Sequence, residues 1–63
     1  MMTVRELLTI IATDKVTIAY WNEGTVNEEY TKTEAITKYG CYKVTYAHAV
    51  ERNHIRIYIN KEE

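Results

Sequence analysis

The sequence predicts an α+β fold, in which a small antiparallel sheet of three to four strands packs one face against two helices. Three observations lead to this prediction. Thr, Val, Ile and Tyr are abundant, and β-branched and aromatic residues favour strands. Two Thr-x-x-Glu capping boxes, beginning at Thr3 and Thr31, each precede a helical apolar pattern. The stretch 42–59 alternates apolar and polar residues with the period of a strand. The expected order is α-β-(β)-α-β-β.

The size and composition indicate a single domain over residues 1–63, because so short a chain cannot support two cores. With 46% hydrophobic and 27% charged residues and a net charge of −1, the chain is neither disordered nor a polyelectrolyte. Cys41 is the one cysteine, so no intramolecular disulfide can form. A secretion signal and a membrane span both lack support, so we expect a cytoplasmic protein without membrane contact.

The first helix is predicted to run from the cap at Thr3 to about Ala12. Its apolar residues follow the i, i+3, i+4, i+7 spacing of one helical face and should cover the sheet: Val4, Leu7, Leu8 and Ile11. Residues 15–22 then change to the period of a strand, with Val16, Ile18 and Tyr20 on one face. Trp21 belongs to the opposite face.

The next segment, residues 25–30, has a weak apolar pattern, and both a return strand and a loop are consistent with it. The second helix follows the cap at Thr31, and Ile36 and Tyr39 are its expected anchors in the core. Gly40 stands where a helix often ends in a left-handed residue.

The final third reads as a hairpin with a turn of two residues, Arg52 and Asn53, or of four, and with Asn53 in the left-handed conformation. Uninterrupted alternation would put even-numbered residues of the third strand and odd-numbered residues of the last strand on the inner face. The expected cross-strand pairs are Val50 with Ile55, His48 with Ile57, and Tyr46 with Ile59. Arg56 and Tyr58 would then face outward.

The chemistry-bearing residues give no pattern typical of a catalytic centre. The chain has no serine, and the predicted alternation separates Cys41 from His48. The same alternation puts His48 and His54 on opposite faces, which disfavours a metal site. Gly24 and Gly40 are isolated, so no glycine-rich phosphate loop is present. We therefore expect a protein without catalytic activity, cofactor or metal.

Six tyrosines and one tryptophan exceed what so small a core can bury, and these residue types anchor protein interfaces. The predicted interaction surface lies on the outer sheet face and comprises Trp21, Lys43, Arg56 and Tyr58. An alternative is that Lys43, Arg56 and Tyr58 bind nucleic acid, although the weakly acidic chain lacks a basic stripe. Another is that the second strand or a terminus covers this patch. Pairing of a sheet edge with a second copy would form a homodimer and add stability to a small core.

Four stretches of the sequence, TVRELL, WNEG, KYG-CYKV and IRIYI, carry a family resemblance. They resemble a group of short proteins encoded by phages and mobile elements of gut-type bacteria, in which a YG-x-Y-x-V pattern enters the third strand. Tyr39, Gly40, Tyr42 and Val44 match that pattern. The resemblance implies a capped helix, a hairpin, a short helix or turn, and a final hairpin. It also implies binding to a host protein, as anti-CRISPR and other defence inhibitors do, and it transfers no catalytic residue.

Overall fold

The computed structural model describes residues 2–21 and 27–60, and two helices and four strands occur in them. In chain order these elements are α1 (Val4–Ile10), β1 (Lys15–Tyr20), β2 (Asn27–Thr31), α2 (Lys32–Tyr39), β3 (Val44–Glu51) and β4 (His54–Ile59). The predicted α+β class and element order are confirmed. The weak segment forms strand β2, while residues 25 and 26 lie outside the described residues.

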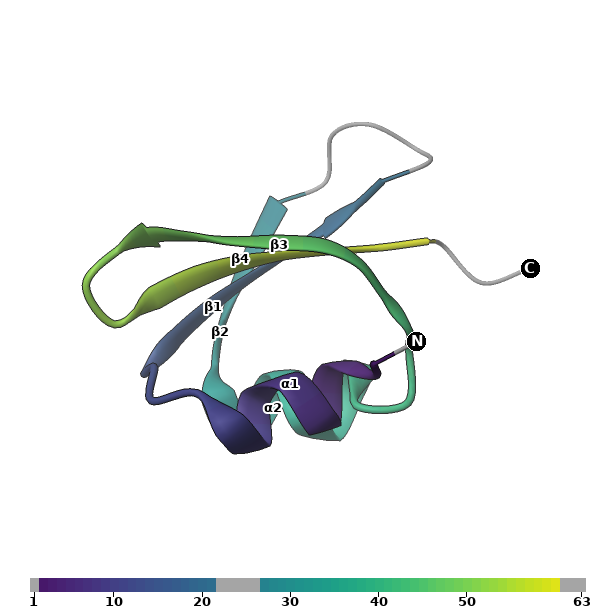
Figure 1. The fold of residues 1–63 in the computed structure, drawn as a ribbon, viewed down its shortest axis with the longest axis horizontal. Coiled ribbons are helices and arrows are strands. Elements are labelled where there is room, and N and C mark those ends of the chain that lie inside the picture. Colours follow the sequence, from purple (N-terminus) through teal and green to yellow (C-terminus); the bar gives the residue numbers. More distant parts are fainter. Residues whose placement is uncertain (1, 22–26, 61–63) are drawn as a thin grey trace.

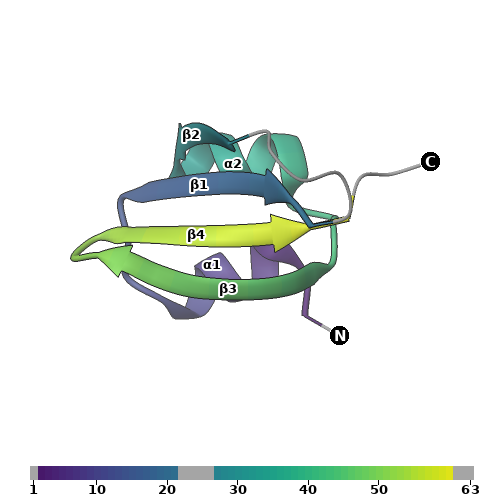
Figure 2. The same ribbon diagram turned by 90° about the horizontal axis from the view of Figure 1, so that it is seen from above.

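The strands form one sheet in the order β2-β1-β4-β3. β2 pairs with β1 and β3 pairs with β4 in antiparallel fashion, whereas the central strands β1 and β4 are parallel, as their arrows in Figure 2 show. The sheet is therefore mixed rather than wholly antiparallel. Parallel neighbours require a long crossover, and β2, α2 and β3 together supply it.

Both helices cover the same face of the sheet, as predicted, and lie together below it in Figure 1. Both predicted capping boxes are present, Thr3 with Glu6 and Thr31 with Glu34. α1 ends at Ile10, slightly before the predicted end, because the backbone of Ile11 is already extended toward β1. The buried core between helices and sheet comprises Val4, Leu8, Val16, Ile18, Ala35, Tyr39, Ile57 and Ile59. Leu7 and Ile11 pack against it while only partly buried.

The second helix is anchored by Ala35 and Tyr39, and the expected anchor Ile36 is only partly buried. The expectation of a left-handed Gly40 is wrong, since its φ of −57° and ψ of −30° are right-handed. A glycine fits here for another reason: the Gly40 N–H donates to the Ile36 carbonyl at 2.9 Å, and a Cβ would collide with that same oxygen.

The C-terminal hairpin has a two-residue turn, the shorter of the two predicted lengths, and Asn53 has the expected positive φ of 63°. The predicted register is wrong. Tyr46 lies opposite Tyr58, not Ile59, and His48 lies opposite Arg56, not Ile57.

The register changes because β3 carries irregularities that the alternating pattern does not reveal. Val44 pairs with Ile59, but the next pair joins Tyr46 to Tyr58, so Thr45 is an extra residue that inverts the alternation. A second shift occurs between Ala49 and Glu51, and it leaves Val50 exposed instead of opposite Ile55. Ala47, not Tyr46 or His48, therefore packs against the core.

Candidate interaction surface

The sheet face opposite the helices, here called the outer face, is seen from above in Figure 2 with the described helices beneath it. Cross-strand pairing aligns four residues in one row across β2, β1, β4 and β3: Glu29, Thr17, Arg56 and His48. A neighbouring row brings Ala19 of β1 beside Tyr58 of β4 and Tyr46 of β3. Two residues that the sequence assigned to the inner face, Tyr46 and His48, thus join the outer face.

Four rings on this face form the aromatic cluster, defined as Trp21, Tyr46, His48 and Tyr58. Trp21 meets the edge of Tyr58 at a centroid distance of 5.4 Å and an angle of 88°, and Tyr46 lies 5.9 Å from both. His48 stacks near Tyr58 at 6.1 Å and 30°. Trp21 and Tyr46 nevertheless stay 55% and 51% exposed. The cluster is ordered by ring contacts and still presents a large apolar surface to solvent.

The position of Trp21 is fixed by its backbone. Its N–H donates to the carbonyl of Ile59 at 2.7 Å, which continues the pairing of β1 with β4 beyond the end of the strand. The adjacent outer-face residue of β1 is Ala19, which is buried beside Tyr58. A small side chain there leaves room for the Tyr58 ring to contact Trp21.

Arg56 is the cation next to the aromatic cluster. Its Nη1 donates to the Tyr58 hydroxyl at 3.4 Å, and its Nε is buried with no hydrogen-bond partner in the structure. Within residues 2–21 and 27–60, the sole ion pair is His54 with Glu29, so no carboxylate of those residues pairs with Arg56. The guanidinium is thus partly desolvated, and no carboxylate in the described ranges neutralises it.

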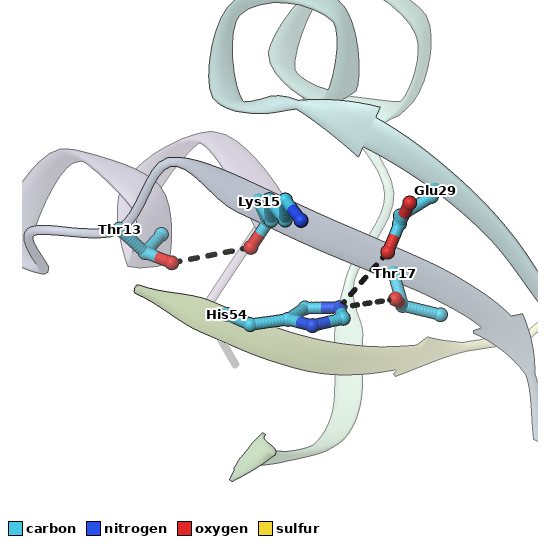
Figure 3. Close-up of polar contacts among 5 residues, drawn as sticks. All are labelled: Thr13, Lys15, Thr17, Glu29 and His54. Atoms are coloured by element: carbon cyan, nitrogen blue, oxygen red, sulfur yellow. Dashed lines mark hydrogen bonds and ion pairs between the residues drawn. The ribbon is translucent and has the colours of Figure 1, made fainter. Parts of the chain in front are cut away.

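A polar group lies on the β2 side of the outer face, shown in Figure 3. His54 Nε2 is 2.6 Å from the Thr17 hydroxyl and 3.8 Å from Glu29 Oε2. A catalytic relay would use one ring nitrogen for the nucleophile and the other for the carboxylate, whereas here Nε2 faces both. Thr17 is also buried. The geometry links β2, β1 and β4 and does not activate the threonine.

Three of the predicted surface residues, Trp21, Arg56 and Tyr58, come together. Lys43 takes no part in the contacts that join them; it lies before β3, where its backbone forms an isolated bridge with Thr3. The chain in that region runs from the helix layer up to the sheet, as Figure 1 shows. Sequence reasoning missed Tyr46 and His48 as members of the surface, because a single extra residue at Thr45 reverses which side chains face outward.

The two histidines also depart from expectation, since both lie on the outer face: His48 is opposite Arg56, and His54 is opposite Glu51. They remain at separate positions of the hairpin. No group of three or more His, Cys, Asp or Glu residues that could hold a metal occurs in the part of the chain that the structure describes. Cys41 is exposed there and forms no disulfide.

Tyrosines on the helix side form a second group around α2. Tyr39 packs edge-on against Tyr30 and Tyr42, and its hydroxyl is 3.3 Å from that of Tyr20. Burial raises the pKa of Tyr39 above its ordinary value. Burial also raises the pKa of Tyr30, and so does the hydrogen bond that its hydroxyl donates to Glu28.

No family model, curated protein or solved structure matches the chain. Of the helices described, neither is long and apolar enough to cross a membrane.

Proposed function

We propose that this protein is a small, non-catalytic interaction module that binds another protein through its outer face. The observation that carries the proposal is the exposed aromatic cluster of Trp21, Tyr46, His48 and Tyr58 beside Arg56. Trp, Tyr and Arg are the residue types that contribute most to binding energy at protein interfaces.

The arrangement of the cluster favours binding because its side chains are ordered before any partner arrives. Trp21 and Tyr46 both contact Tyr58, so each ring limits the rotamers of its neighbour. Ordering side chains on binding costs conformational entropy, and a preformed cluster avoids part of that cost. Exposed apolar area is then available to stabilise the complex.

Binding of nucleic acid is supported less well. The rings contact one another, at interplanar angles from 30° to 88°, whereas bases stack on free ring faces. Lys43, which the nucleic-acid alternative requires, pairs with Thr3 before β3 begins, and the outer face also carries Glu29 and Glu51. A polyanion would meet both attraction and repulsion on this surface.

We further propose a biological setting from the sequence resemblance. In this setting the protein acts in the cytoplasm of a bacterial host, without a cofactor, as a phage or mobile-element product that modulates a host protein such as a defence system. Self-association through a sheet edge belongs to the same proposal, and β2 and β3 are the edge strands available for it.

Substitution of the cluster tests the proposal. In a pull-down from host lysate, we expect Trp21→Ala and Tyr58→Ala to lose a specific partner, with affinity reduced by about 30-fold or more, as for interface hot spots. Ile10→Ala is the matched control, because Ile10 is 67% exposed but lies on α1. Circular dichroism would verify that each variant folds. Equal retention of the partner by all variants would contradict the proposal, and salt-sensitive retention of RNA or DNA alone would favour the nucleic-acid alternative.

A further inference from the structure

We propose that the partner presents an Asp or Glu carboxylate to Arg56, next to apolar side chains that cover the aromatic cluster. This inference rests on the proposed function and adds the chemistry of the partner. The outer face is then specific for an acidic residue within an apolar protein segment.

The guanidinium of Arg56 has unused hydrogen-bond donors. An arginine has five N–H donors and no acceptor. Among the described residues, the guanidinium of Arg56 makes one hydrogen bond, the 3.4 Å contact from Nη1 to the Tyr58 hydroxyl, and its Nε is buried without a partner. Of the guanidinium nitrogens, Nε is the one buried without a partner, so an external anion would accept from the Nη N–H groups and lie beside the desolvated charge.

The acidic residues Glu29 and Glu51 on this face do not pair with Arg56. Glu29 is aligned with Arg56 but separated from it by Thr17, and its Oε2 lies 3.8 Å from His54. Glu51 is the cross-strand neighbour of His54, not of Arg56. Among the described residues, the charge of Arg56 thus remains available to an external anion.

A carboxylate is the anion that fits Arg56 best. A guanidinium pairs with a carboxylate in a planar, two-point geometry, and aromatic neighbours exclude water around such a pair. Arg56 is one cation between the aromatic cluster on one side and Glu29 on the other, so a single negative charge is complementary and a chain of phosphates is not. The apolar rings require apolar groups beside that charge.

A random peptide library displayed on phage provides the test. We expect peptides selected on the wild-type protein to share an Asp or Glu beside aromatic or aliphatic residues. Selection on Arg56→Glu should replace that acidic position by Lys or Arg, because the charge at residue 56 is reversed. Arg52→Glu is the matched control, since Arg52 is exposed in the turn and the same charge change should leave the selected motif unchanged.

A synthetic peptide with the selected motif gives the quantitative result. We expect Arg56→Gln to weaken its binding by at least about tenfold, and replacement of the peptide's acid by its amide to do the same. Combining both changes should cause little further loss, because each removes the same interaction. Amide NMR spectra would verify that the variants keep the fold.

The outcomes separate this inference from the proposed function. Peptides that need Trp21 but show no acidic preference, or that bind Arg56→Glu equally well, would overturn the carboxylate partner and leave the docking face intact. A wild-type selection that yields no peptides, or only peptides that bind Trp21→Ala unchanged, would count against both proposals.

Discussion

At the scale of single residues, two positions show how local chemistry and tertiary contact combine. Asn53 takes a left-handed conformation that Asn tolerates, and its place between two alternating strands predicts this. Gly40 is needed for a different reason from the one its sequence context suggests, because the Ile36 carbonyl approaches too closely for a side chain. Whether Gly40 is left-handed or in close contact with the Ile36 carbonyl depends on how α2 ends, and the sequence pattern does not reveal this.

Tyr39 leads to a prediction about pH. Its phenol is neutral when protonated, and burial raises its pKa in the folded state above the unfolded value of about 10. The contribution of the protonated Tyr39 phenol to folding stability is therefore complete below about pH 10, and it is lost as the pH rises through the folded pKa. We expect the thermal unfolding midpoint of the wild-type protein to decrease as the pH is raised through this alkaline range. The midpoint of Tyr39→Phe should decrease less over the same range. Tyr46→Phe, at an exposed position, is the control, and identical profiles for both variants and wild type would contradict the assignment.

At the scale of the elements, the two helices are the best predicted parts of the chain. Each begins at a capping box that can be read from four consecutive residues, and each cap is formed as expected. Their signals are local, because the side chain and the backbone groups it satisfies are three residues apart. Strand β3 is the opposite case. Its bulge at Thr45 is defined by the pairing with β4, so the alternating pattern assigned Tyr46 and His48 to the wrong face.

The capping box of α2 supports a prediction about stability. The Thr31 hydroxyl accepts from the Glu34 N–H at 3.2 Å, so Thr31→Ala should lower the free energy of unfolding by about 0.5–2 kcal/mol. Thr33→Ala in the same helix is the control and should be neutral or slightly stabilising, because Thr33 is exposed and alanine favours helix. Urea unfolding measures both. A loss for Thr33→Ala as large as that for Thr31→Ala would contradict the role of the cap.

At the scale of the whole molecule, stability rests on a single core layer between the helices and one sheet face. Ile57 is fully buried at its centre, on strand β4 between β1 and β3. A core of this size gives about 3–5 kcal/mol of net stability, which is comparable to the cost of one large cavity. The protein therefore has little tolerance for core substitutions.

Substitution of Ile57 tests this balance. Ile57→Ala should cost about 2–5 kcal/mol and leave much of the protein unfolded, whereas Ile57→Val should cost about 0.5–1.5 kcal/mol and stay folded. Val50→Ala is the control, since Val50 is 45% exposed. Thermal unfolding followed by circular dichroism measures the stability of the three variants, and the dispersion of their amide NMR spectra shows which of them are folded. Equal stability of Ile57→Ala and Val50→Ala would contradict the placement of Ile57 in the core.

The sequence by itself determined the α+β class, the order of the elements, both helix starts, the turn at Asn53 and the outward position of Tyr58. These features follow from side-chain periodicity and from contacts between residues close in the chain. Tertiary structure alone decided the parallel pairing of β1 with β4 and the side of the sheet on which Tyr46 and His48 lie. The reason is that strand pairing joins residues far apart in sequence, and one added residue reverses the faces of a strand at little local cost.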